Sequence, residues 1–171
     1  SAGGGGIGMQ IVNNFNELKS AVDKTKNLAK KAFGNSDIFL EKFIRNSRHI
    51  EIQVFGYGEK SAVHFYERDC SIQRRFQKII EESPAPKVDQ SIIKKMAEMS
   101  VKFASDQKYE GAGTIEFIYD IDQKEFYFLE MNTRIQVEHP VTEEITGVDL
   151  VELQIKYALN LDSTRVLQNE I

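Results

Sequence analysis

Apolar residues recur every three or four positions in three parts of the chain, and this spacing predicts three amphipathic helices. The first covers residues 14–32, with Asn14 or Asn16 as its cap. The second follows the cap residue Asp89, and the third runs from about residue 149 to 159. The predicted apolar face of the second helix consists of Ile92, Ile93, Met96, Met99, Phe103 and Ala104.

Shorter segments alternate between apolar and polar residues with a period of two, which predicts strands. Two of them, residues 111–120 and 125–132, form a predicted hairpin. The others lie at residues 9–12, 37–44, 48–55 and 62–69. An antiparallel sheet backed by a helix makes an α+β fold. We expect two parts, residues 1–82 with the first helix and residues 83–171 with the hairpin and the later helices.

One stretch, residues 130–138, carries a high concentration of polar groups. At the period of an extended strand, two carboxylates, a guanidinium and two amides share one face. These residues are Glu130, Asn132, Arg134, Gln136 and Glu138. Such groups bind metal ions and oxyanions, although a half-buried strand whose polar face meets water has the same pattern. Residues elsewhere in the chain favour the first interpretation.

The predicted hairpin places Glu116 opposite Glu130 if its turn centres near Asp122 and Gln123. Directly opposed residues have Cβ atoms about 5 Å apart. Two carboxylates at that distance repel each other unless a cation lies between them. With Asn132 beside them, they suit Mg²⁺ or Mn²⁺, which leave ligand positions for phosphates. The histidines and the cysteine have no spacing that predicts zinc.

Two further segments have the chemistry of anion binding. Residues 74–78 hold three cations interleaved with Phe76 and Gln77, which suits a phosphate or bicarbonate but also a solvated basic turn. Residues 3–8 are rich in glycine, but they precede a predicted strand rather than a helix, so they are not a dinucleotide fingerprint. They form either a lid over phosphates or a flexible linker.

Composition narrows the class of protein. The chain has 171 residues, of which 41% are hydrophobic and 28% charged, as in globular domains. Its formal charge of -4 argues against a general nucleic-acid binder. The single Cys70 excludes an intrachain disulfide, and no apolar run is long enough to span a membrane. The glycine-rich start suggests a piece of a larger protein, which we expect in the cytoplasm or, in a eukaryote, the mitochondrial matrix.

Recognisable blocks of residues run through nearly the whole chain. They lie at residues 3–9, 48–51, 67–71, 73–75, 77–78, 84–86, 111–117 and 130–142. In their order and in their amino-acid sequence, these blocks resemble biotin carboxylases, which are ATP-grasp enzymes. The resemblance implies an ATP-grasp fragment, in which an antiparallel lid subdomain with a backing helix is followed by part of a second sheet-and-helix subdomain.

The resemblance also implies a role for each matching residue. The nucleotide would be bound by Gly4, Gly5, Gly6, Gly8, Met9, Glu41, Lys42, Ile44, His49 and Gln73. The metal would be bound by Glu116, Glu130 and Asn132. Bicarbonate would be bound by Lys78, Arg134, Gln136, the backbone of Val137, and Glu138. Within this last group, Lys78, Arg134 and Glu138 are the implied catalytic residues, with Glu138 as the general base.

The implied reaction activates bicarbonate with MgATP to give carboxyphosphate, which carboxylates biotin on a carrier domain or protein. A carboxyltransferase component would then pass the carboxyl group to acetyl-CoA, propionyl-CoA, pyruvate or urea. The sequence of residues 1–9 is similar to the corresponding segment of urea carboxylases. Members of the family are often dimers, so the resemblance is also compatible with a homo-oligomeric parent protein.

Some features depart from the family's pattern. Phe76 stands where many biotin carboxylases have a histidine that contacts the nucleotide. The lysine before the glycine run, the N-terminal domain and a later arginine are not part of this chain, so we expect the chain alone to be inactive. Two alternatives stay open: another bicarbonate-activating ATP-grasp ligase resembling carbamoyl-phosphate synthase, or a nucleotide-binding module without turnover.

Overall fold

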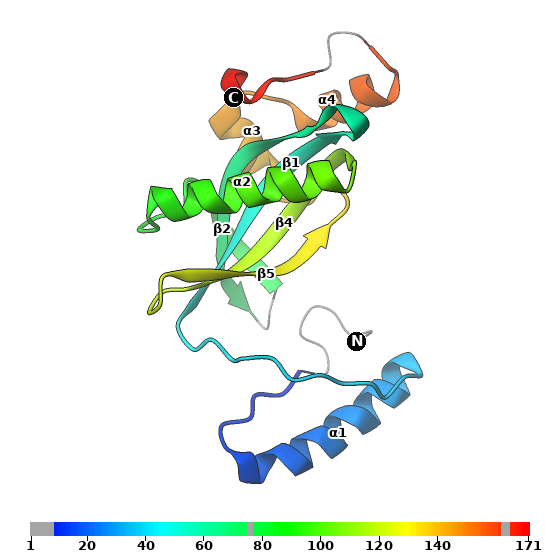
Figure 1. The fold of residues 1–171 in the computed structure, drawn as a ribbon, viewed down its shortest axis with the longest axis vertical. Coiled ribbons are helices and arrows are strands. Elements are labelled where there is room, and N and C mark those ends of the chain that lie inside the picture. The colour runs from blue at the N-terminus through cyan, green and yellow to red at the C-terminus, as the bar shows by residue number, and fades with distance from the viewer. Residues whose placement is uncertain (1–8, 75–76, 162–164) are drawn as a thin grey trace. The chain divides into compact units, whose positions relative to one another are not determined.

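The computed structural model describes residues 9–74, 77–161 and 165–171. The predicted phosphate-binding glycines, Gly4, Gly5, Gly6 and Gly8, and also Phe76 lie outside these residues. The chain divides into two compact units, which can be followed by residue number in Figure 1. The first is formed by Ser1–Arg45 and Gln73–Gln77, and the second by Asn46–Ile72 and Lys78–Ile171.

The first unit contains helix α1, Phe15–Phe33, close to the predicted bounds. The Asn14 side chain accepts a hydrogen bond from the backbone N–H of Glu17, and Gly34 ends the helix in the left-handed conformation. Residues 9–12 and 37–44 form no strand, so these two predictions are wrong. A strand requires a hydrogen-bonded partner, and within the described sheet no strand pairs with either segment.

The second unit is built on a five-stranded sheet with the order β3-β2-β1-β4-β5. The strands are β1 (Ser47–Tyr57), β2 (Ala62–Arg74), β3 (Gln77–Glu82), β4 (Glu110–Asp120) and β5 (Glu125–Asn132). The short 3-10 helix η1 (Gly58–Lys60) joins β1 to β2. Strand β1 pairs antiparallel with both β2 and β4. Strands from both sides of residue 82 therefore share one sheet, and the predicted subdomain boundary at that residue stays a prediction.

The hairpin of β4 and β5 has the predicted register, with Glu116 opposite Glu130. Phe117 pairs with Phe128, and uninterrupted pairing would place Leu129 opposite Glu116. An irregularity next to Glu116 adds one residue on β5, so that Glu130 takes this position instead. The bulge thus places Glu130 directly opposite Glu116 in the register.

Helix α2 (Gln90–Asp106) covers one face of the sheet and crosses the strands in Figure 1. The Asp89 side chain caps its start, as predicted, by accepting from the backbone N–H of Ser91. Met99 and Phe103 are 55% and 41% exposed, so only part of the predicted apolar face is buried. The core between helix and sheet includes Ile50, Ile52, Val54, Ile92, Ile93, Met96, Ala97, Ala104, Ile115 and Phe117.

The opposite face of the sheet packs on helix α4 (Leu150–Ala158), which lies close to the predicted bounds and is capped by Asp149. Its core includes Phe55, Phe65, Leu150 and Leu153. Because side chains alternate along β1, Glu51 and Gln53 share this face with Phe55, and both are fully buried. This face therefore changes from apolar to polar along the strand, and the candidate site lies at the polar end.

The segment after β5 differs from the prediction. Strand β5 ends at Asn132, so a single extended strand over residues 130–138 is wrong. Helix α3 (His139–Thr146), where no helix was predicted, follows. Pro140 lies in the first turn of α3, where its missing N–H breaks no helical hydrogen bond. The bend leaves Gln136 buried and Val137 90% exposed.

The described chain ends in a short 3-10 helix, η2 (Gln168–Glu170). Among the described residues, none of the helices combines the length and the apolar character needed to cross a membrane. The predicted α+β fold, an antiparallel sheet with helices packed on it, is confirmed.

Candidate active site

A row of charged residues crosses the polar end of the sheet. The register places Arg68 of β2 beside Glu51 of β1, and Glu51 beside Glu116 of β4. Glu116 in turn lies beside Glu130 of β5. Arg68 and Glu51 are fully buried, and Glu116 is only 4% exposed. Charges taken out of water at this depth require partners, so the row implies a network.

Lys78 of β3 joins several of these carboxylates. Its Nζ donates hydrogen bonds to Glu51, to Glu116 Oε1 at 3.1 Å and to Glu138 Oε1 at 2.8 Å. Glu138 directly precedes α3, so one ammonium group links two sheet strands to the segment that follows the hairpin. Lys78 therefore holds the predicted general base next to a predicted metal ligand.

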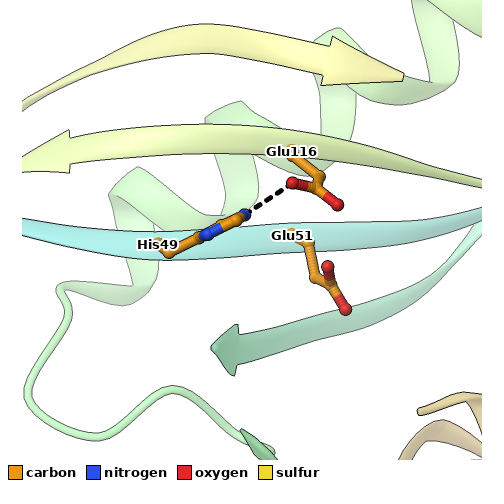
Figure 2. A group of neighbouring side chains, drawn as sticks. All are labelled: His49, Glu51 and Glu116. Carbon is orange, nitrogen blue, oxygen red and sulfur yellow. Dashed lines mark hydrogen bonds and ion pairs between the residues drawn. The ribbon is translucent and has the colours of Figure 1, made fainter. Parts of the chain in front are cut away.

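Both oxygens of Glu116 accept hydrogen bonds. Oε1 accepts from Lys78, from Asn132 Nδ2 at 2.7 Å and from Gln136 Nε2 at 3.1 Å. Oε2 lies 2.7 Å from Nε2 of His49, the contact drawn in Figure 2. His49 and Glu51 are two residues apart on β1, so their side chains project from the same face beside Glu116, as Figure 2 shows. These contacts stabilise the ionised form of Glu116.

The pKa values of the site follow from these contacts. Burial alone would raise the pKa of Glu116, but the hydrogen bond to His49 and the charge of Lys78 lower it to about 2. Burial would also raise the pKa of Glu138, and the hydrogen bond from Lys78 brings it below its ordinary value. Burial would lower the pKa of Lys78, but the charge of Glu51 outweighs it and raises the pKa. At neutral pH both carboxylates are ionised and the lysine is charged.

Glu81 of β3 has a different environment. Burial, reinforced by the charges of Glu138 and Glu51, raises its pKa to about 7. Its Oε2 is buried, makes no hydrogen bond within the described part of the chain, and lies 3.9 Å from Arg68 Nε. Burial also raises the pKa of the neighbouring Cys70, which is therefore a neutral thiol. This edge of the network is where a carboxyl group is least well satisfied.

The structure brings together part of the predicted site. The residues in mutual contact are His49, Lys78, Glu116, Asn132, Gln136 and Glu138. Glu130 is exposed, and it is related to this group by its position opposite Glu116 on the neighbouring strand. Arg134 is exposed and donates to the carbonyl of the adjacent Ile135 at 3.2 Å, and Val137 is exposed as well. The roles implied for these three residues stay predictions.

The residues predicted to contact the nucleotide lie mainly in the first unit. Met9, Glu41, Lys42, Ile44 and Gln73 all belong to it. Met9 is 61% exposed, and the segment that contains Glu41, Lys42 and Ile44 has no regular secondary structure. Their implied roles, and those of the glycines outside the described residues, stay predictions.

Three buried residues of the network had no role assigned from the sequence. Glu51, Arg68 and Thr142 are all fully buried, and Arg68 donates to both of the others at 2.6 Å and 2.7 Å. One signal was present: Glu51 and Gln53 alternate with apolar residues in β1, which predicts a polar face. The pattern does not show that this face is covered, because the covering residues come from elsewhere in the chain.

The residues around Glu116 fit a hard divalent cation. Glu116 and Glu130 are paired positions on neighbouring strands, and Asn132 lies next to Glu116. The low pKa of Glu116 keeps this ligand ionised at neutral pH. Two carboxylates and an amide supply the oxygen ligands that Mg²⁺ and Mn²⁺ prefer. His49, Glu51 and Glu116 also lie within 4.8 Å of one another, but Lys78 binds both carboxylates of that group.

The antiparallel sheet with its helices matches solved biotin carboxylase structures, and so agrees with the ATP-grasp fragment that the sequence resemblance implies. Residues 1–165 match the family "Carbamoyl-phosphate synthase L chain, ATP binding domain", and the chain belongs to that family. The resemblance to biotin carboxylases is also confirmed. Biotin carboxylase 1 of Bacillus subtilis is 49% identical over 162 residues, which are 95% of this chain and 36% of that protein.

Two further comparisons extend this result. Urea amidolyase of Lachancea kluyveri is 51% identical over 92% of this chain and 9% of its own length. The biotin carboxylase domain of Hydrogenobacter thermophilus 2-oxoglutarate carboxylase, solved with MgADP, ADP and bicarbonate, superposes with a TM-score of 0.90 at 48% identity. That match covers all of this chain and 37% of the solved chain. The chain thus spans about a third of the biotin carboxylases that it matches, and 9% of the urea amidolyase.

Proposed function

We propose that this chain is the ATP-binding and bicarbonate-binding part of a biotin carboxylase. The parent enzyme would use MgATP to convert bicarbonate into carboxyphosphate and then transfer the carboxyl group to biotin. The observation that carries the proposal is the position of Lys78, whose ammonium binds Glu138 and Glu116 at once. A module that only bound nucleotide would not need a carboxylate base held beside the metal ligand.

Glu116, Glu130 and Asn132 are the proposed metal ligands. Mg²⁺ or Mn²⁺ bound there would neutralise charge on the phosphate oxygens of ATP. His49 donates from Nε2 to Glu116 Oε2 and so holds this carboxylate in place. The nucleotide itself would be bound by the residues predicted from the sequence: Gly4, Gly5, Gly6, Gly8, Met9, Glu41, Lys42, Ile44, His49 and Gln73.

Glu138 is the proposed general base. It is ionised at neutral pH because Lys78 lowers its pKa, so it can accept the proton of bicarbonate. Lys78, Arg134 and Gln136, with the backbone of Val137, would hold the anion and offset the charge it gains. The deprotonated oxygen would attack the γ-phosphate of ATP, forming the new P–O bond of carboxyphosphate and releasing ADP.

The partners of the parent enzyme are proposed from its relatives. A biotin-bearing carrier and a carboxyltransferase component would complete the reaction. The parent would form a homo-oligomer, as the biotin carboxylase domain of Hydrogenobacter thermophilus 2-oxoglutarate carboxylase forms a dimer. Relatives named for urea and for methylcrotonoyl-CoA match at 51% and 52% identity, so this chain does not select the acceptor. We place the parent in the cytoplasm or, in a eukaryote, in the mitochondrial matrix; the mouse relative is named mitochondrial.

Replacing the proposed base tests this function. In the full-length parent, Glu138→Gln is expected to lower bicarbonate-dependent ATP hydrolysis by about 10²- to 10⁴-fold, the usual contribution of a general base. Binding of MgATP, measured by calorimetry, should stay unchanged because Glu138 is not a nucleotide ligand. Glu144→Gln, at an exposed position of the helix α3 that Glu138 precedes, is the matched control. Full turnover in the Glu138 variant would contradict the proposal.

The family to which the chain belongs also supports a second candidate function. A ligase resembling carbamoyl-phosphate synthase would share the metal ligands and would also activate bicarbonate. The two functions differ in their dependence on biotin. ATP hydrolysis by the parent should rise when free biotin or a biotinylated carrier is added if it is a biotin carboxylase, and should not respond if it is the other ligase.

A further inference from the structure

Arg68 is the largest fully buried side chain in the described part of the chain. It lies in β2, and its side chain is fully buried. A guanidinium has five N–H donors in a rigid planar fork. Each of the five can be matched to an acceptor, so the orientation of the side chain is fixed. The acceptors are Glu51 Oε1, Gln53 Oε1, Thr114 Oγ1, Gln136 Oε1 and Thr142 Oγ1.

These acceptors come from two parts of the unit. Three of them, Glu51, Gln53 and Thr114, belong to the central strands β1 and β4. The other two lie beyond the hairpin: Nη2 donates to Gln136 Oε1 at 3.1 Å, and Nη1 donates to Thr142 Oγ1 at 2.7 Å. Arg68 therefore ties the segment after β5 and the start of α3 to the middle of the sheet.

Gln136 connects the fixed side chain of Arg68 to the reaction site. Its amide oxygen accepts from Arg68, while its amide nitrogen donates to Glu116 Oε1 at 3.1 Å. Because the oxygen is held by Arg68, the nitrogen must point toward the carboxylate. The segment itself has little regular backbone pairing, and its ends are held by contacts such as His139 N–H to the carbonyl of Gln136 at 3.3 Å. Side-chain anchors thus decide where residues 133–138 lie.

We propose that Arg68 is a positioning residue for the bicarbonate site. It acts through Gln136 and Thr142, which set the place of the segment that carries Arg134, Gln136 and Glu138. This inference rests on the proposed function, since it assigns Arg68 to the binding of bicarbonate rather than of nucleotide. Lysine could not replace it, because a single ammonium cannot reach acceptors on both sides with fixed geometry.

Thr142 offers the mildest test, because it is outside the proposed catalytic and metal-binding residues. In the full-length parent, Thr142→Val removes one acceptor of Arg68 and keeps the size of the side chain, whereas Thr142→Ser keeps the hydroxyl. A hydrogen bond to a charged group is lost in the valine variant, so KM for bicarbonate should rise about tenfold or more. KM for MgATP should stay near that of the wild type, and the serine variant should behave like the wild type.

Two further variants separate positioning from general stability. Arg68→Lys should raise KM for bicarbonate more than Thr142→Val does, because it removes the fork itself. Thr114→Val removes an acceptor on the sheet side, at 3.4 Å from Nη2, and should leave KM for bicarbonate unchanged. If Thr142→Val changed both KM values alike, or if Thr114→Val had the same effect, Arg68 would be only a structural residue.

Amide hydrogen exchange tests the same inference without catalysis. In Thr142→Val, amides of residues 133–138 should exchange faster, while those of β1 and β4 should exchange as in the wild type. Unchanged exchange in residues 133–138 would overturn the inference even in an active enzyme. A wild-type parent without bicarbonate-dependent ATP hydrolysis would instead refute the proposed function, and the exchange result would still decide whether Arg68 positions this segment.

Discussion

Strand β1 has two buried faces, and they are stabilised in different ways. On one face Ile50, Ile52 and Val54 pack against α2 and the neighbouring strands, and each is fully buried. On the other face Glu51 and Gln53, also fully buried, bind Arg68 through hydrogen bonds of 2.6 Å and 2.8 Å. Because the residues of both faces are equally buried, the comparison shows how apolar packing differs from a hydrogen-bonded ion network.

The two faces tolerate change differently. Apolar packing is graded and has no direction, so removing a methylene group costs roughly the contacts of that group. An ion network has strict geometry, and removing one member leaves its partners buried without compensation. The polar face therefore contributes little net stability while it fixes side chains accurately. That property suits a reaction site, and it makes the polar face the more fragile of the two.

The largest expected effect comes from removing the carboxylate at the centre of the polar face. Glu51→Leu leaves Arg68 and Lys78 without a shared partner and should lower the free energy of unfolding by about 3 to 5 kcal/mol. Glu51→Gln keeps an acceptor of similar shape and should cost less. Urea titration followed by circular dichroism measures both. A leucine variant as stable as the wild type would show that the two faces respond alike.

A smaller effect, dependent on pH, is expected at Glu81. Burial raises its pKa from 4.5 to about 7, so the folded protein binds this proton more tightly than the unfolded chain. The resulting stabilisation is complete below pH 4.5 and is lost as the pH rises through about 7. Glu81→Gln should remove this pH dependence, which amounts to about 3 kcal/mol at most.

Unfolding free energies measured across this pH range, for wild type and variant, test the prediction at Glu81. The wild type should lose stability relative to Glu81→Gln as the pH rises. Glu82→Gln, at the exposed neighbouring position, is the control and should follow the wild type. Parallel curves for wild type and Glu81→Gln would mean that this carboxyl group is solvated rather than buried beside the network.

Local patterns predicted the elements whose signals lie within them. The helix caps Asn14 and Asp89, the approximate bounds of the last helix and the hairpin register at Glu116 were all found as expected. The predicted strand at residues 37–44 failed because its alternation had no partner strand to pair with within the described sheet. Whether an alternating segment becomes a strand depends on distant residues, which the segment does not contain.

The candidate site shows the same division. Carboxylates concentrated in residues 130–138 and at Glu116 were visible as a pattern, and Lys78 stood in a basic cluster. The position of Lys78 between Glu51, Glu116 and Glu138 was not visible, because it depends on β3 lying at the edge of the sheet. Arg68 gave no sign of its role, since its five acceptors are spread over four separate segments of the chain.

The smallest effect is expected on the apolar face, one residue away from Glu51. Ile52→Val removes one methylene group from a fully buried side chain and should lower the free energy of unfolding by about 0.5 to 1.5 kcal/mol. KM for bicarbonate in the parent should stay unchanged, because Ile52 points toward α2 and away from the reaction site. The same urea titration, with the kinetic assay, measures both quantities.

Ile79→Val provides the control for that variant, since Ile79 is 59% exposed on β3 and the same change there should cost less. A loss at Ile52 as large as that of Glu51→Leu would mean that the sheet core is intolerant on both faces. A change in KM for bicarbonate would mean that packing on the α2 face also positions the polar residues. Either result would remove the distinction between a graded apolar face and a geometrically strict polar face on the same strand.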